Sequence, residues 1–245
     1  MLIVLPPSET KTPGGTGEPL SLKALSFPQL NPVRTQLIKD LSALKIADAL
    51  SILGISENLK SEAQANKHLR TSPTMPAIFR YSGVLYDALD AASLPDFALN
   101  RLAIGSALFG VVRATDQIPH YRLSGGTKVP TKTGELPTLK ARWGTAITEA
   151  LFDAEPLVVD LRSGTYQQLG RVKNAVTVRV ESVLEDGSRK VVSHFNKHYK
   201  GKLARVLASS PQEATTAAEV AAIARAAGMT IEENPAHNET FTLVV

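Results

Sequence analysis

The sequence of 245 residues contains no cysteine, only 5% aromatic residues and no apolar run near the length of a membrane span. Without cysteine there is no disulfide framework, no thiolate-bound zinc or iron–sulfur cluster and no cysteine nucleophile, which is compatible with a reducing compartment. The first five residues are apolar, but no basic segment or small-residue cleavage site accompanies them as in a secretory signal. We therefore expect a cytoplasmic protein that does not associate with membranes.

The apolar content of 43% is enough for a chain of this length to bury a sizeable core. Disorder, collagen and a coiled coil are excluded as descriptions of the whole chain. The sequence has no internal repeat and no linker long enough to separate two domains. We therefore expect a single domain over residues 1–245.

Short apolar and alternating segments predict strands. Residues 1–5 and 157–161 are continuous apolar runs of the kind found in strands buried on both faces. Residues 175–184 and 190–195 have β character on either side of Asp186-Gly187, a dipeptide that favours a tight turn. The two terminal segments, 230–233 and 241–245, are further strand candidates.

Helical spacing of apolar residues predicts helices at 31–69, 139–152 and 197–207. Residues 99–112 are expected to be helical or mixed. Thr216 and Glu219 form a capping box that opens another helix, which we expect to stop at Gly228. Together these elements predict a mixed α and β fold, in which helices surround a mixed β-sheet.

The charge is unevenly distributed along the chain. The net charge is +4, but residues 101–210 carry 17 basic groups against nine acidic ones, and residues 211–245 carry one against five. A basic surface follows if the middle segments share one face, which would attract an anionic partner. Evenly solvated lysines are the alternative.

A candidate helix-hairpin-helix lies within residues 40–66. Its turn is Leu53-Gly54-Ile55-Ser56, in which glycine allows a tight backbone turn and the second helix starts near Ser56. Free amides at such a helix start can bind a phosphate without reading the base sequence. An ordinary helical corner, with Gly54 ending one helix and Ser56 capping the next, fits the residues equally well.

The densest polar segment is 109–122, which contains Arg113, Asp116, Tyr121 and Arg122. Arginine suits either a buried ion pair that fixes a loop or a site for an anion. We expect Arg113 and Asp116 to be partly buried and to pair with each other, or with Arg122 and Tyr121, at the wall of a cleft.

A basic helix follows at 197–207, with Lys197, Lys200 and Arg205 as candidate phosphate contacts. A solvated helix face is the alternative. His194 and His198 have the spacing of metal ligands on a helix, but residue 195 is phenylalanine where a zinc protease needs glutamate. We therefore expect no metal and no other cofactor.

Taken in order, several motifs resemble the YaaA family of bacterial peroxide stress resistance proteins. The matching segments are 5–11, 81–89, 106–123, 143–144, 160–166 and 193–205. The resemblance implies a mixed α/β domain of that family's own type, with a helix-hairpin-helix and a positively charged cleft. It also implies binding to double-stranded or distorted DNA and protection against peroxide when iron is in excess.

The resemblance places the family's recurrent polar residues at defined positions of this chain. They are Thr10, Arg113, Asp116, Tyr121, Arg122, Trp143, Ser163, Tyr166, Lys197, Gly201 and Arg205. This chain departs from many members by having Glu9 in place of lysine, Ser124 in place of an acid and His198 in place of a second lysine. Losing two lysines lowers the positive charge of the implied cleft.

Two functions follow as hypotheses. The first is a monomeric binding protein that holds DNA by its phosphates, with little sequence preference, and limits oxidative damage. Its expected DNA or anion contacts are Thr10, Lys11, Arg113, Tyr121, Arg122, Lys197, Lys200 and Arg205.

The second hypothesis is an enzyme, a hydrolase or lyase acting on a nucleotide or on a nucleic-acid phosphate or base. Arg113, Arg122 and Lys197 would hold the anion, with Asp116, Ser163 and Tyr166 as catalytic candidates. Convergence of these side chains in one concavity would favour an enzyme, whereas an open groove would favour a DNA-binding protein.

Overall fold

The computed structural model describes residues 1–192, 195–234 and 237–245 of the chain. Its main sheet has the strand order β4-β3-β1-β6-β7-β10-β9, and β8 pairs with the outer part of β7. Strands β3, β1, β6, β7 and β10 are parallel to their neighbours in this series, whereas β4, β8 and β9 are antiparallel additions. The expected mixed sheet is therefore present and mostly parallel.

The strands of the main sheet are β1 (Leu2–Leu5), β3 (Leu102–Ser106), β4 (Gly110–Arg113), β6 (Val158–Asp160), β7 (Val176–Val183), β8 (Arg189–Val191), β9 (Thr230–Asn234) and β10 (His237–Val244). A small second sheet pairs β2 (Thr74–Pro76) with β5 (Gln117–Pro119). The α-helices are α1 (Asn31–Ala43), α2 (Ile46–Leu53), α3 (Lys60–Ala65), α4 (Ala77–Arg80), α5 (Val84–Leu89), α6 (Asp96–Leu99), α7 (Leu139–Trp143), α8 (Ala146–Phe152), α9 (Gly164–Gln167), α10 (Asn196–Ser209) and α11 (Ala217–Ala226).

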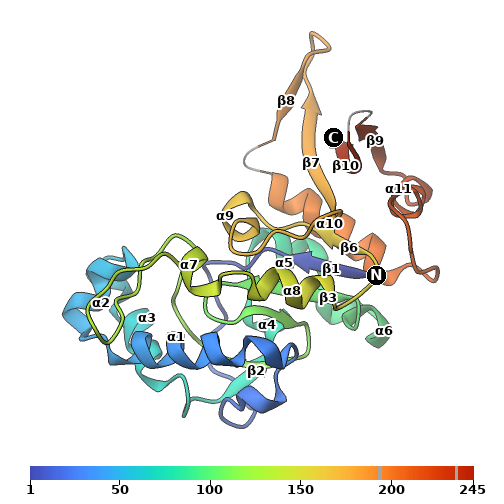
Figure 1. The fold of residues 1–245 in the computed structure, drawn as a ribbon. Coiled ribbons are helices and arrows are strands. Elements are labelled where there is room, and N and C mark those ends of the chain that lie inside the picture. The colour runs from blue at the N-terminus through green and yellow to red at the C-terminus, as the bar shows by residue number, and fades with distance from the viewer. Residues whose placement is uncertain (193–194, 235–236) are drawn as a thin grey trace.

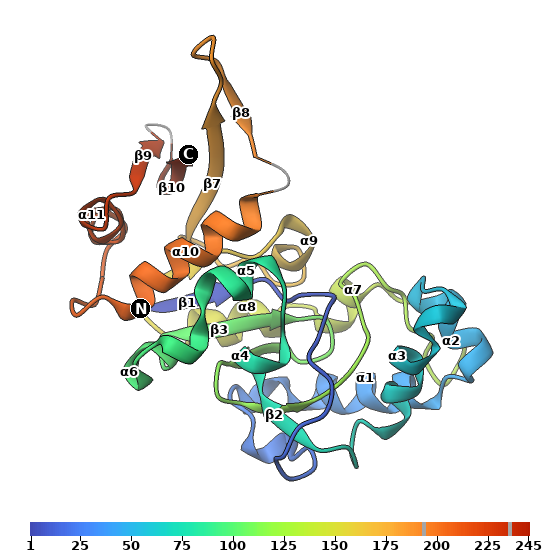
Figure 2. The ribbon, with the colours of Figure 1, turned by 180° about the vertical axis from the view of Figure 1, so that it is seen from behind.

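The central strands are apolar because helices cover both faces of the sheet. All four residues of β1 and all five of β3 are buried, as the continuous apolar run at the N-terminus predicts. Figures 1 and 2 show α5, α6 and α10 on one face and α8 on the other. The segment containing α1, α2 and α3 lies at the lower left in Figure 1, and the β7–β8 hairpin projects upward, away from it.

Most predicted elements are confirmed. Strands β1, β6 and β7 occupy their expected segments, the Asp186-Gly187 turn joins β7 to β8, and Thr216 and Glu219 form the capping box of α11. The segment 99–112 contains the β3–β4 hairpin. The helix expected over 139–152 is interrupted at Gly144, which has a positive φ of 53° and separates α7 from α8.

The candidate hairpin region contains α2, a turn and α3. Gly54 has a left-handed φ of 63° and ends α2, while Ile55 packs against the core. The second helix starts as a single 3₁₀ turn at Glu57–Leu59, and the Ser56 side chain makes no capping hydrogen bond. The helical corner is thus present, whereas a DNA-binding helix-hairpin-helix stays a prediction.

Gly201 marks the closest approach of two helices. A Cβ atom at this position would lie 2.3 Å from the carbonyl oxygen of Leu85 and 2.9 Å from the Cβ of Ala88. Glycine is therefore needed where α10 crosses α5. Its low helix propensity, roughly 1 kcal/mol less favourable than that of alanine, is outweighed by this close packing. This contact fixes α10 against the segment that opens α5.

Candidate functional site

At β1 the chain changes the direction in which it adds strands to the sheet. Such a change leaves a crevice at the carboxyl end of the strand. The chain leaves β1 to form β3 on one side and later returns to form β6 on the other side. In open parallel sheets, ligands bind outside the carboxyl ends of strands at such a reversal. We call this region the carboxyl edge and define it by residues 6–11, 106, 121–125 and 160–166, together with the side chains that contact them.

Lys11 is buried at the carboxyl edge. Its side chain is held there because the loop after β1 forms a β-bridge between Lys11 and Tyr81. Its Nζ donates a hydrogen bond to the carbonyl oxygen of Ser8 (3.1 Å) and lies 4.4 Å from the ring centroid of Tyr121. Among the described residues, no carboxylate forms an ion pair with it. Burial therefore lowers the pKa of Lys11 from 10.5 to about 8.

A chain of hydroxyl groups runs beside Lys11. The Tyr81 and Tyr121 hydroxyls share a hydrogen bond of 2.7 Å, and the Tyr121 and Ser106 hydroxyls share one of 2.8 Å. Burial raises the pKa of Tyr81 to about 12 and that of Tyr121 well above its usual value. These groups are therefore neutral at physiological pH and can pass a hydrogen bond along the chain without carrying charge.

Arg122 and Tyr166 close the carboxyl edge on its solvent side. Arg122 donates to the carbonyl oxygen of Glu9 (3.2 Å) and forms an ion pair with the Glu9 carboxylate (3.2 Å). The Tyr166 hydroxyl accepts a hydrogen bond from the Gly125 amide (3.1 Å), and burial raises the pKa of Tyr166. Arg122 therefore ties its loop to the loop that follows β1, and Tyr166 ties α9 to the loop around Gly125.

A buried ion pair lies at the end of β6. Asp160 and Arg162 are only 3% and 2% exposed, and two hydrogen bonds of 2.8 Å join their side chains. Gly105 of β3 leaves room for the pair, since a Cβ there would lie 2.7 Å from the Arg162 side chain. Lys200 donates to the carbonyl oxygen of Leu161 (3.2 Å), and burial lowers the pKa of Lys200.

A pocket of about 190 Å³ opens beside these groups. Its walls are the loop after β1, including Ser8 and Thr10, the start of α5 at residues 82–86, and Lys197 from α10. The Tyr86 hydroxyl donates to the carbonyl oxygen of Pro6 (2.9 Å) and fixes one wall. A space of this size admits a phosphate group or a single sugar but excludes a duplex.

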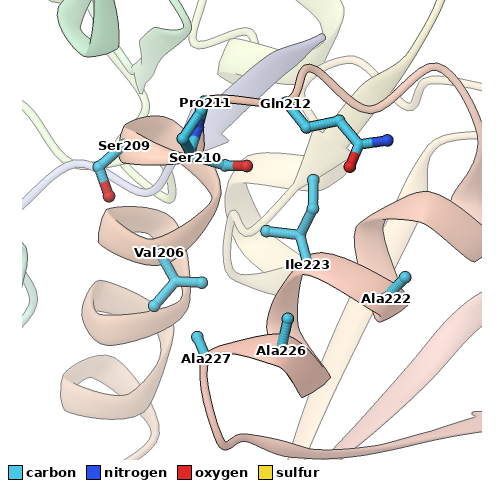
Figure 3. A pocket seen from close by; sticks show the side chains of 9 residues that line it. All are labelled: Val206, Ser209, Ser210, Pro211, Gln212, Ala222, Ile223, Ala226 and Ala227. Atoms are coloured by element: carbon cyan, nitrogen blue, oxygen red, sulfur yellow. The ribbon is translucent and has the colours of Figure 1, made fainter.

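A larger pocket, of about 630 Å³, lies far from this chemistry between α10 and α11 (Figure 3). Val206 of α10 faces Ile223 and Ala226 of α11 across it. Its lining is uncharged and mostly apolar. It offers none of the cations that an anionic ligand needs.

The predicted pairing of Arg113 with Asp116 is wrong. The Asp116 carboxylate accepts hydrogen bonds from the amide and hydroxyl of Ser26 (3.1 and 2.9 Å) and from the Arg113 amide (2.9 Å). The Arg113 guanidinium points elsewhere, to the carbonyl oxygen of Asn100 and to Glu155. Arg113 pairs with Ala103, near the amino end of β3. The side chains of Arg113 and Asp116 therefore lie away from the carboxyl edge.

We expect Asp116 to stabilise the fold. Replacing it with alanine would leave the Ser26 and Arg113 donors without their acceptor, at a cost of about 1–3 kcal/mol. Urea denaturation of Asp116→Ala should show this loss of stability as a lower transition midpoint. A variant as stable as the wild type would contradict this structural role.

The remaining predicted residues are divided by the structure. Seven of them lie at the carboxyl edge or in its pocket: Thr10, Lys11, Tyr121, Arg122, Tyr166, Lys197 and Lys200. Ser163 is exposed and precedes the first residue of α9. Arg205 lies two turns along α10 from Lys197 and donates to the carbonyl oxygens of Leu89 and Asp90. Trp143 is buried in the core, and His194 lies outside the described residues.

Sequence reasoning missed several groups at this site. Tyr81, Tyr86 and Ser106 entered only as parts of matching segments, and the Asp160–Arg162 pair received no role. The signal for that pair was available, because two opposite charges directly after a buried strand must be compensated locally. Nothing local marks Tyr81 as the neighbour of Lys11, 70 residues away in the sequence.

Across residues 1–192, 195–234 and 237–245, no group of three or more histidine, aspartate or glutamate side chains is arranged to hold a metal ion. In the same residues, no helix has both the length and the apolar character needed to cross a membrane.

The fold defines an α/β protein with a mostly parallel sheet, and its candidate functional site lies at the carboxyl ends of the parallel strands. Residues 1–234 match the family described as peroxide stress protein YaaA, and the chain belongs to this family. It is 72% identical to a UPF0246 protein of Corynebacterium glutamicum strain R over the full length of both chains. A UPF0246 protein of Streptomyces coelicolor is 41% identical, with 96% of this chain and 94% of the relative covered.

Proposed function

We propose that this member of the peroxide stress family binds DNA by its phosphates at the carboxyl edge, with little sequence preference. The observation that carries the proposal is the convergence of Lys11, Arg122, Lys197 and Lys200, which come from three segments: the loop after β1, the loop around residue 122, and α10. The nearby acids are Glu9 and Asp160, each paired with an arginine, and Glu62, which is paired with His120. The excess positive charge suits a phosphodiester.

The size of the pocket supports a particular mode of contact. A space of about 190 Å³ holds one phosphate or sugar, so a duplex would lie across the carboxyl edge and not inside it. A mismatch bubble or another distortion frees individual nucleotides from the stack and lets one approach Lys197 and Thr10. Binding to such DNA in peroxide stress would shield exposed nucleotides from oxidation.

The test is the salt dependence of DNA binding. Wild-type protein should retain a duplex that contains a mismatch bubble at low ionic strength, with affinity falling steeply as salt rises. Lys197→Ala should weaken binding to all sequences and flatten the salt slope by about one unit, because one cation no longer neutralises a phosphate.

Lys202→Ala provides the matched control, because Lys202 is exposed on the same helix and does not line the pocket. Its binding should equal that of the wild type. The proposal fails if the wild type shows no salt-sensitive retention, or if the Lys197 and Lys202 variants behave alike.

A second candidate function is an enzyme acting on a nucleotide or nucleic acid at the same edge. The observation in its favour is Lys11, whose pKa of about 8 leaves part of the population as a neutral amine near physiological pH. The Tyr81, Tyr121 and Ser106 hydroxyls could transmit a proton beside it. Product analysis after incubation with nucleotides and distorted duplexes separates an enzyme from a binding protein, and Lys11→Met should abolish any turnover.

A further inference from the structure

A second group of cations lies on the exposed face of α1, apart from the carboxyl edge pocket. One groove of about 420 Å³ has Lys39, Lys67 and Arg70 in its lining. An adjoining groove of about 630 Å³ has Lys39, Lys45 and Lys132. The two grooves share Lys39 and Ala43, so they form one continuous hollow across the C-terminal half of α1. We call this hollow the α1 groove.

The charges of the α1 groove are not neutralised by the protein. In the described part of the chain, Lys39, Lys45, Arg70 and Lys132 make no side-chain hydrogen bond or ion pair, and Lys67 donates only to the Ser42 carbonyl oxygen (3.0 Å). Two acids line the groove. Asp40 is buried and bound to Arg142 at 2.7 Å, which leaves only Asp48 to oppose the five cations.

Two buried arginines show what a structural role looks like in this fold. Arg34 and Arg80 are buried and donate to several backbone carbonyl oxygens, which explains their place in the fold. Arg70 makes no such hydrogen bonds within the described residues, although the neighbouring residue, Leu69, is buried in the core. Its charge is therefore available to an external anion.

The α1 groove is rigidly connected to the carboxyl edge. Asn66, directly before Lys67, donates to the Arg122 carbonyl oxygen (2.8 Å) and accepts from the Arg122 amide (2.9 Å). Ser42 of α1 in turn donates to the Asn66 carbonyl oxygen (2.8 Å). Three short hydrogen bonds thus link the helix that carries Lys39 to the residue whose guanidinium borders the proposed phosphate site.

The predicted hairpin is less suited to phosphate than the α1 groove. Its turn at residues 53–56 carries no cation and is followed at once by Glu57, which forms an ion pair with Lys60. A carboxylate at that helix start competes with a phosphate for the same free amides. The opposite end of this helix pair, near Lys45 and Lys67, carries the positive charge.

We propose that the α1 groove is a second phosphate-binding surface, which holds the backbone of a DNA duplex that also contacts the carboxyl edge. This inference rests on the proposed function. The groove has no aromatic residue in its lining on which a base could stack, so it would bind the backbone without reading sequence. Phosphate contacts at two places would orient the duplex across the molecule.

The experiment removes four charges that have no structural contacts. The groove variant combines Lys39→Gln, Lys45→Gln, Arg70→Gln and Lys132→Gln. Its matched control combines Lys23→Gln, Lys173→Gln, Lys190→Gln and Lys202→Gln, which removes the same charge from exposed positions outside the groove. Equal melting temperatures for the two variants establish that both are folded.

Binding of a 30-bp duplex is measured against salt concentration. The groove variant should bind roughly tenfold or more weakly than its control, with the salt slope reduced by about 0.9 for each phosphate that the variant no longer neutralises. Equal affinities for the two variants would overturn the inference. So would binding of the wild type to phosphatidylserine vesicles in place of DNA.

The two proposals fail in different ways. If Lys197→Ala weakens binding but the groove variant binds like its control, the carboxyl edge stands and the α1 groove is only a solvated surface. If the groove variant alone loses affinity, DNA is held at α1 and the carboxyl edge is not a phosphate site. If the wild type does not bind DNA, both proposals are wrong.

Discussion

Replacement of Asp160 by alanine is expected to destabilise the protein by roughly 3–5 kcal/mol, the usual cost of leaving a buried charge without its partner. Arg162 is 2% exposed, and its two side-chain hydrogen bonds to Asp160 would be broken. The remaining acceptors are the carbonyl oxygens of Gly170 (2.8 Å) and Tyr166 (3.3 Å), which carry no full charge. Urea denaturation should show the loss of stability as a lower transition midpoint.

A paired variant provides the control. Combining Asp160→Ala with Arg162→Met removes both charges, so it should recover much of the stability that the single variant loses. An equally large loss in the double variant would show that packing at the end of β6, and not the unpaired charge, causes the effect. An Asp160→Ala variant as stable as the wild type would contradict the prediction.

Lys11→Met is expected to stabilise the protein near neutral pH by an amount on the order of 3 kcal/mol. Burial lowers the folded-state pKa of Lys11 to about 8, whereas the unfolded chain keeps the ordinary value of 10.5. Each unit of difference corresponds to about 1.4 kcal/mol. Below pH 8 the folded protein bears the full cost of the buried ammonium, which methionine removes.

The pH dependence of this effect has a defined sign. Between pH 8 and 10.5 the unfolded chain binds more protons at Lys11 than the folded protein, so wild-type stability rises with pH relative to the variant. The advantage of Lys11→Met should therefore shrink over this window and vanish near its upper end. Urea denaturation at several pH values measures it, with Lys202→Met as an exposed control whose difference from wild type stays constant. A constant difference for Lys11→Met would contradict the assigned pKa.

Local signals explain what could be predicted from the sequence. The apolar run of β1, the turn between β7 and β8, and the capping box at Thr216 each depend on neighbouring residues, and all three are confirmed. The polar segments that match the family also contain most of the cations that lie at the carboxyl edge. Their clustering there depends on the strand order, which periodicity does not reveal.

Long-range contacts explain what could not be predicted. The three-residue spacing of Arg113 and Asp116 suggests an ion pair, but Ser26, 90 residues earlier, supplies two of the donors that bind the carboxylate. Lys11 lies in a loop rich in glycine, proline and threonine, a composition typical of exposed chain. It is buried because that loop pairs with the segment around Tyr81.

The close contact at Gly201 has a thermodynamic consequence for ligand binding. The walls of the small pocket include the start of α5 and Lys197 of α10, and the backbones of these two helices come close together at Gly201. Helices in such contact cannot slide apart without losing their packing. The pocket is therefore preorganised, so a bound phosphate would need to immobilise little beyond the Lys197 side chain.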